Sequence, residues 1–257
     1  MSDYFVDKNS IVRQIWGKAD TILFIFAGAS AEFALNKSVD WLYFTGRLPS
    51  DPLGRLFSTV AYAQRILFSD YDGALRAIDQ ITTIHKNVEG NRGMRIPDEA
   101  YLDVLYLLID YSIRSYELLE RKLSDPEKAE VFEVFYRVGK RMALAGLPVS
   151  YRDWLIKRTE QLTTGLHCSD FTFDLYRQYR KHLGFARYWI LRQAQVLLVP
   201  KQAKALLRLS SIHWLSHIVF IYKLFRLVNL QNILKNAILP PAYATQVRAM
   251  DSIISLK

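Results

Sequence analysis

The sequence has a single cysteine, Cys168, among its 257 residues. One cysteine cannot form a disulfide within the chain, and its scarcity favours a reducing compartment. Glycine and proline are also scarce, with 11 and 8 residues, which is below their average usage. An all-β chain needs many tight turns built on these two residues, so the composition favours long uninterrupted helices instead.

Long uncharged apolar runs are missing as well. Glu32 interrupts the N-terminal candidate, and His217 and Lys223 interrupt the C-terminal one. No run therefore reaches the roughly 18 residues typical of a spanning helix, and we expect none. The N-terminal sequence MSDYFVDKNS lacks the basic and then apolar segments of a secretory signal. We predict a cytoplasmic location, with association at a membrane surface left open.

Several catalytic and cofactor-binding motifs are absent. No two glycines lie two positions apart, so the sequence has no G-x-G-x-x-G or Walker A phosphate-binding loop. No glutamate lies three residues before a histidine, which removes the E-x-x-H pairs of a ferritin-like di-iron bundle. A G-x-S-x-G nucleophile turn and a C-x-x-C-H haem-attachment motif are also missing. The remaining candidates are isolated polar residues on apolar helix faces.

What is present points to a large helical core. Hydrophobic residues make up 51% of the chain and aromatic residues 13%, which excludes a disordered protein. Apolar residues recur at helical spacing from end to end. Asp51 predicts a helix start, and so does Asp70 before a helix that reaches about Val88 and is stopped by Gly90 and Gly93.

Further helices are expected over the rest of the chain. They run from Pro97 to about Leu123, from the capping box SDPE at 124–127 to Gly146, over 170–198, and from Ala203 to about Leu239. No internal repeat or linker separates them. We therefore predict one all-α domain over residues 1–257, with a functional core at about 20–155 and a C-terminal helical extension at about 168–257.

The chain is basic. It has 34 Lys and Arg against 25 Asp and Glu, and 34 − 25 gives a net charge of +9. This charge suits nucleic acid, an anionic membrane surface or an anionic ligand, but an ordinary solvated basic surface is the more common explanation. No recognition motif supports nucleic acid binding, so we expect none. The basic and apolar 203–239 segment could contact a membrane peripherally or form a homodimer.

His85 is the most informative polar residue. It shares one helix face with Ala74, Ile78, Ile81 and Val88, which are otherwise all apolar. From this pattern alone, a satisfied core histidine is the more common explanation, and a ligand to a cofactor is the alternative. One predicted helix earlier lie Arg55 and Thr59, which are i, i+4 neighbours.

The spacing of these residues permits a cofactor site. Thr59 and His85 are 26 residues apart, which leaves room for two helices joined by a short loop to flank a flat ligand such as haem. In such a site a histidine binds the iron, the opposite helix supplies a polar group, and a cation meets a propionate.

Two other histidine patterns are weaker. His213 and His217 have the spacing of two zinc ligands, but Trp214 stands where the H-E-x-x-H motif has its glutamate. Two polar residues on an amphipathic face explain this pair better. His167 beside Cys168 could stabilise a thiolate, although an inert half-buried thiol is the simpler interpretation.

Three segments resemble a known family in the same order. They are DPLGRLFSTVAYAQRILF, ALRAIDQITTIHKNVEG and LSDPEKAEVFEVFYRVGKRMALAGLP. Together they resemble the mpaB-type oxygenases and latex-clearing proteins, the rubber oxygenases. The similarity covers roughly Phe24 to Trp154, and the order, spacing and helical context of the segments agree with the family.

The resemblance implies a globin-like helical core that holds haem b. His85 matches the proximal iron ligand of the family, and Arg55 and Thr59 match its distal-side arginine and threonine. In known members the haem activates O2 to cleave a double bond in an isoprenoid chain. Ser58 stands where latex-clearing proteins have a lysine able to cap the iron, so a capped closed state is not expected. A histidine ligand also agrees with the lone cysteine.

The resulting prediction is a haem b-dependent oxygenase that uses O2 to oxidise a hydrophobic, unsaturated small molecule. Arg55 would stabilise bound oxygen or anchor a propionate, and Thr59 would face the oxygen. A non-catalytic haem sensor or carrier and a haem peroxidase-like enzyme remain alternatives. Candidate pocket walls are Phe24, Phe26, Phe57, Tyr62 and Tyr106, although ordinary core is the more common role for residues at this spacing.

Overall fold

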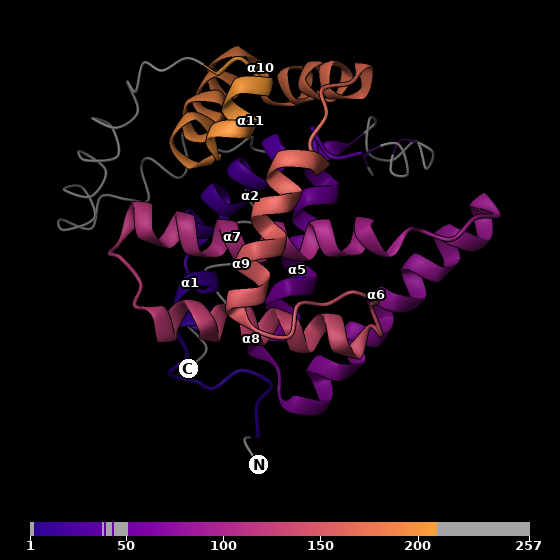
Figure 1. Cartoon of the computed structure of the whole chain (residues 1–257), viewed down its shortest axis with the longest axis vertical. Helices are drawn as coiled ribbons and strands as arrows, with labels where there is room; N and C mark the ends of the chain where they lie inside the picture. The colour runs from indigo at the N-terminus through magenta and orange to yellow at the C-terminus, as the bar shows by residue number, and fades with distance from the viewer. Residues whose placement is uncertain (1–2, 38, 40–42, 44–50, 210–257) are drawn as a thin grey trace.

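The computed structural model describes residues 3–37, 39, 43 and 51–209. Over these residues the chain is helical, with two isolated β-bridges and no strands. The all-α prediction is therefore confirmed. The helices are α1 (Ile11–Trp16), α2 (Ala19–Phe33), α5 (Pro52–Phe68), α6 (Tyr71–Arg92), α7 (Asp98–Leu119), α8 (Asp125–Arg141), α9 (Tyr151–Glu160), the π-helix η1 (Gln161–Gly165), α10 (Asp170–Leu198) and α11 (Lys201–Leu206) (Figure 1).

The predicted helix starts are confirmed by their caps. The Asp51 carboxylate accepts a hydrogen bond from the Gly54 amide at 2.8 Å at the start of α5. Asp70 accepts one from the Gly73 amide at 2.6 Å at the start of α6. The capping box of α8 is also formed, with Ser124 as its first residue. These caps satisfy amides that would otherwise lack partners at each helix start.

Three predicted helix ends are wrong. Helix α6 continues through Gly90 to Arg92, and only Gly93, with φ of 70°, ends it. Helix α7 ends at Leu119 instead of about Leu123. Helix α8 ends at Arg141, well before Gly146, because the chain leaves the helical region there and Ala143 adopts a φ of 56°. The segment expected from Ala203 to about Leu239 lies mostly outside the described residues.

The longest helix, α10, matches its predicted bounds of 170–198 but is kinked. Gly184 has φ of 72° and ψ of 174°, a conformation open to glycine but strained for other residues. The two halves of the helix therefore run in different directions. Seven charged side chains interrupt α10, and none of the helices in the described ranges is long and apolar enough to cross a membrane.

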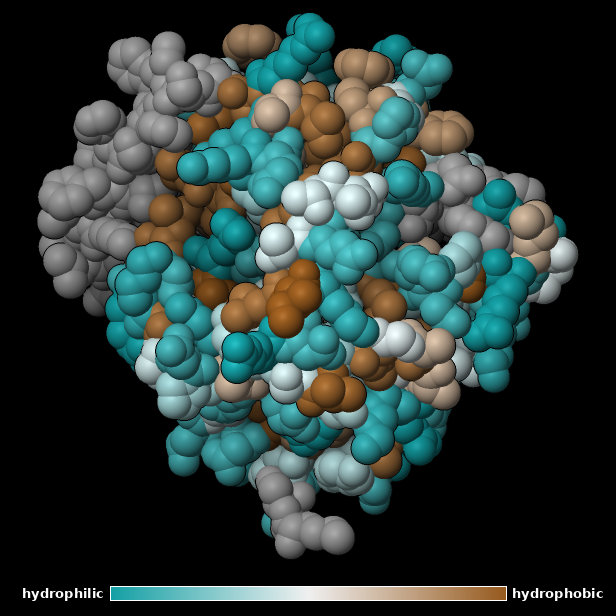
Figure 2. Space-filling view, viewed as in Figure 1, coloured by the Kyte–Doolittle hydropathy of each residue, from teal (hydrophilic) through white to brown (hydrophobic). Residues whose placement is uncertain are grey.

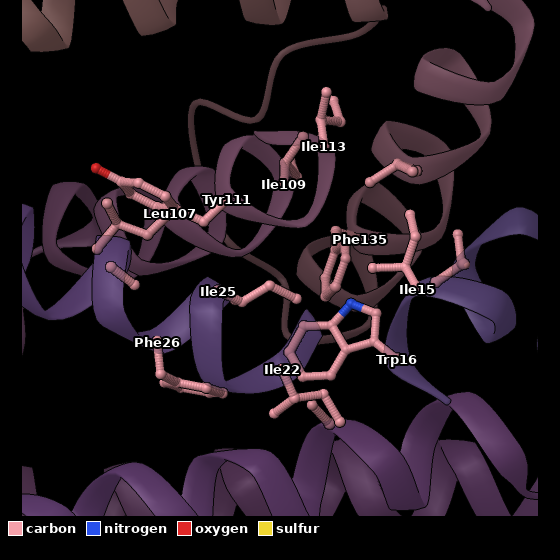
Figure 3. Packing of buried hydrophobic residues seen from close by; sticks show 14 of the residues in the cluster. Ile15, Trp16, Ile22, Ile25, Phe26, Leu107, Ile109, Tyr111, Ile113 and Phe135 are labelled. Carbon is pink, nitrogen blue, oxygen red and sulfur yellow. The ribbon is translucent and has the colours of Figure 1, made fainter. Parts of the chain in front are cut away.

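The main core forms where α2 packs against α7, with α1 and α8 beside them. Figure 3 shows Ile22, Ile25 and Phe135 gathered around Trp16. The Trp16 side chain is fully buried, and its indole N–H donates to the Ser112 hydroxyl at 3.0 Å. One continuous cluster of buried side chains reaches from the N-terminal segment to α11. The globin-like arrangement and the division into a core and an extension remain predictions.

Gly28 allows the close approach of α2 and α7. A Cβ atom at this position would overlap the ring of Tyr111, which is itself fully buried. We expect Gly28→Ala to lower the free energy of unfolding by about 1–3 kcal/mol, because the ring has no space to move into. Gly90→Ala is the matched control, since nothing lies near its Cβ position. Urea denaturation of both variants would test this, and equal stability would contradict the close contact.

Candidate functional site

His85 lies where the apolar stripe of α6 leaves the core. Ala74 and Ile78, earlier on the stripe, are fully buried, whereas Ile81, His85 and Val88 are only half-buried. Figure 1 shows the C-terminal half of α6 extending past the body of the molecule. His85 is therefore at the edge of the core, with part of its apolar surroundings left uncovered.

The imidazole of His85 is held on one side and has an unpaired nitrogen. The ring of Tyr101 on α7 meets it edge to face, with the ring centroids 5.0 Å apart and an interplanar angle of 70°. The Tyr101 hydroxyl donates to Glu89 Oε1 at 3.3 Å, and the Ile96 amide donates to the same oxygen at 2.9 Å. His85 Nδ1 is buried and has no hydrogen-bond partner among the described residues. Because Nδ1 is enclosed by protein atoms, a ligand would meet the ring at its other nitrogen, Nε2.

The surroundings favour the neutral imidazole. Burial lowers the pKa of His85 below the usual 6.5, and the positive charge of Arg55 lowers it further, against a smaller opposing effect of Glu89. Burial also raises the pKa of Tyr101, with Glu89 adding to the effect, so Tyr101 remains a protonated donor. A neutral imidazole is the form that binds metals.

Arg55 and Thr59 lie on α5, which packs against α6, the helix that carries His85. Arg65 Nη1 donates to Gln80 Oε1 at 3.1 Å between the two helices. Thr59 lies one turn after Arg55 on the same helix. The effect of Arg55 on the pKa of His85 shows that these two residues also lie within range of each other's charge.

The Thr59 hydroxyl donates its hydrogen bond within its own helix. It donates to the Arg55 carbonyl at 3.1 Å, and the exposed Ser58 hydroxyl donates to the same carbonyl at 2.8 Å. A hydroxyl engaged in this way presents its acceptor lone pairs to a ligand. The half-buried guanidinium of Arg55 is then the positive group of the site.

We expect Arg55→Ala to raise the pKa of His85, because the substitution removes a positive charge that disfavours the imidazolium. Glu89→Gln should lower it for the opposite reason. Arg65→Ala, on the same helix but facing Gln80, is the matched control. An NMR titration of the His85 ring protons gives the values. An unchanged His85 pKa in Arg55→Ala would show that the two residues are farther apart than described.

The sequence also offered other histidines and a cysteine as possible ligands. His167 is exposed and its amide donates to the Leu35 carbonyl at 2.7 Å, while Cys168 is half-buried against the core. Neither joins the His85 site. The pair His213 and His217 lies outside the described residues. Within the described ranges, no group of three His, Cys, Asp or Glu residues is placed to hold a metal ion.

The candidate pocket walls are mostly core. Phe26, Phe57 and Tyr106 are buried within the main cluster, and Phe24 and Tyr62 are half-buried. Burial of this kind fits the ordinary core role that their spacing also predicted.

A buried charge network was not predicted. The Arg158 side chain on α9 lies between Glu32 on α2 and Asp110 on α7, and these three residues are 4%, 1% and 7% exposed. Arg158 Nη2 donates to Glu32 Oε2 at 2.8 Å and to Asp110 Oδ2 at 2.7 Å. Arg158 Nη1 makes a further short contact to Glu32 Oε1. The network ties three helices together through the centre of the molecule.

Neighbouring side chains complete this network. The Tyr111 hydroxyl donates to Glu32 Oε2 at 2.8 Å, and Arg114 Nε donates to Asp110 Oδ1 at 2.7 Å. The two carboxylates are thus matched by two guanidinium groups. The attraction of both carboxylates outweighs burial and raises the pKa of Arg158 above its usual value. The sequence does contain an indication of this network. One acidic residue, Glu32 or Asp110, lies within each of two otherwise apolar stretches, AGASAEFAL and YLLIDYSI.

Comparison with known proteins identifies one match. The family described as "ER-bound oxygenase mpaB/B'/Rubber oxygenase, catalytic domain" matches residues 16–229. This range covers most of the chain and includes both α5 and α6. No curated protein and no solved structure gives a significant match.

Proposed function

We propose that this chain, which belongs to the ER-bound oxygenase mpaB/B' and rubber oxygenase catalytic-domain family, is a haem b-dependent oxygenase whose site is centred on His85. The oxygenase activity follows from membership of this family. The observation that carries the haem proposal is the unpaired, half-buried imidazole of His85 at the edge of the core.

The residues present fit a haem group. The imidazole of His85 would be the iron ligand, and its lowered pKa keeps it in the required neutral form. Tyr101 would fix the orientation of the ring through the edge-to-face contact. The contact of Tyr101 with Glu89 is therefore the support that holds the ligand in position.

Uncovered apolar side chains beside His85 support the same proposal. Ile84, the residue before His85, is 37% exposed, while Ile81 and Val88 on the same stripe are half-buried. A flat apolar ligand would remove this surface from water, at roughly 25 cal/mol for each Å² covered. Apolar contacts together with one histidine ligand are a common way for a protein to hold haem b.

Arg55 and Thr59 would serve the opposite side of the site. The Arg55 guanidinium would pair with a haem propionate or with negative charge that develops on oxygen. Thr59 would offer its hydroxyl lone pairs to a polar group of the reactants, because its proton is bonded to the Arg55 carbonyl. Haem, when bound, supplies an iron able to activate O2 for the oxidation of a hydrophobic, unsaturated substrate.

Oxygen consumption tests this function. Reduced, haem-supplied protein should take up O2 in proportion to an added isoprenoid alkene, and little with the saturated analogue of the same length. Mass spectrometry with ¹⁸O2 should place label in the product. Haem binding without O2 uptake on any alkene would support a sensor or carrier instead. Turnover that requires hydrogen peroxide would support a peroxidase-like enzyme.

A further inference from the structure

The exposed aromatic side chains are concentrated on α10. Among the described residues, every Phe or Trp that is largely exposed belongs to this helix. Phe173 is 63% exposed and Phe185 is 73% exposed, with Phe171 and Trp189 at 39% and 41%. Isolated exposed apolar residues are common, but several large aromatics on one element indicate a contact surface.

This surface forms one end of the molecule. Figure 1 is drawn with the longest axis vertical, and α10 and α11 lie together at the upper end, opposite the N-terminus. Figure 2 shows brown apolar side chains standing out along the same edge. The kink at Gly184 separates the half of α10 that carries Phe173 from the half that carries Phe185. Each half of α10 therefore carries a largely exposed phenylalanine.

The same end carries most of the net positive charge. Residues 170–208 contain eight Lys and Arg and two Asp, so 8 − 2 gives +6 of the total +9. One of the aspartates, Asp174, is already paired with Arg177 at 3.0 Å. Arg180 and Lys181 are exposed and lie between Phe173 and Phe185 in the sequence of α10. Exposed aromatics bordered by unneutralised cations are typical of a surface that meets anionic lipids.

We propose that the end formed by α10 and α11 docks on an anionic membrane surface. Phe173, Phe185 and Trp189 would enter the boundary between headgroups and acyl chains, and Arg180 and Lys181 would contact the lipid phosphates and carboxylates. A second copy of the chain fits this surface less well, because a symmetric contact would bring two strongly positive surfaces together. The surface lies upstream of most of the 203–239 segment and does not depend on haem.

Vesicle co-sedimentation with the full chain tests this docking. Vesicles of phosphatidylcholine containing about a third phosphatidylserine should bind the protein, and pure phosphatidylcholine should bind it at least about tenfold more weakly. Binding should weaken several-fold between about 0.1 and 0.5 M salt, because the Debye length falls from about 10 Å to below about 5 Å and screens the attraction to the lipids. Equal binding to both kinds of vesicle would overturn the proposal.

An aromatic double variant and its control locate the surface. The double change of Phe173 and Phe185 to serine should weaken binding about tenfold or more, since two apolar anchors are lost. Ile156→Ser is the control, because Ile156 on α9 is 64% exposed but lies outside this surface. A melting curve by circular dichroism confirms that each variant is folded. Unchanged binding of a folded Phe173 and Phe185 double variant would overturn the proposal.

The charge variants distinguish lipid from other partners. Arg180→Glu with Lys181→Glu should remove the preference for phosphatidylserine, whereas Lys140→Glu with Arg152→Glu changes the net charge equally on exposed sites elsewhere and should retain it. Loss of binding in both double variants would show a non-specific effect of net charge and contradict a defined surface. Tighter binding to a single-stranded DNA oligonucleotide than to these vesicles would contradict a lipid partner.

Discussion

His85→Ala is expected to reduce haem affinity by more than about a hundredfold, because the substitution removes the only proposed protein ligand to the iron. The side chain is half-buried at the edge of the core and its Nδ1 has no partner among the described residues, so its loss should cost little folding stability. Haem titration followed by the Soret band gives the affinity. Circular dichroism gives the helical content, which should match the unaltered protein.

Two further variants make this test specific. His167→Ala removes an exposed histidine far from α6 in sequence and should bind haem normally. His85→Gly should regain a histidine-like spectrum when free imidazole is added, since imidazole can occupy the vacated space. An unchanged Soret band in His85→Ala would place the iron ligand elsewhere, with His213, His217 and Cys168 the next residues to replace.

Arg158→Met is expected to lower the free energy of unfolding by about 3–5 kcal/mol. The substitution leaves Glu32 and Asp110 buried without the guanidinium that lies between them. Glu32 then loses its guanidinium partner in a site closed to water, and Asp110 keeps only its pair with Arg114, so the loss of one partner of this buried network is costly. Urea denaturation followed by circular dichroism gives the change in stability.

A surface arginine provides the comparison. Arg141 makes two hydrogen bonds to Asp79 at 2.8 and 2.6 Å, but both side chains are about half exposed. Arg141→Met should therefore change stability far less than Arg158→Met, because water solvates the carboxylate that remains. Adding Glu32→Gln and Asp110→Asn to Arg158→Met should recover part of the loss. Equal effects of the two arginine variants would contradict a buried network.

Helix α7 connects the network with the candidate site. Asp110, in the middle of the helix, contacts Arg158, and Tyr101, in its first turn, contacts His85. The network fixes α7 against α2 and α9. The position of Tyr101, and through it the orientation of His85, thus depends on a helix that is anchored at the centre of the molecule.

Sequence predicted the features that depend on nearby residues. Asp51 and Asp70 bond to amides three residues away, so their caps can be read from the sequence alone. The apolar stripe that contains His85 follows from helical periodicity, and the family resemblance identified the same residue. Whether the stripe was buried along its whole length could not be predicted, because burial depends on which helices cover it.

The features that sequence missed depend on distant residues or on backbone geometry. Glu32 and Arg158 are 126 residues apart, and nothing in either local sequence pairs them. Gly184 lies within a continuous helical pattern, and the residue types around it do not indicate its φ of 72°. The early end of α8 was missed for the same reason, since Ala143 has no helix-breaking character of its own.

The most direct test of the central claim is a haem titration of the unaltered protein. If His85 binds haem as proposed, the titration will saturate at one haem per chain, and the reduced form will have the absorption spectrum of a histidine-ligated haem b. A folded protein that gives no Soret band beyond that of free haem would contradict the account.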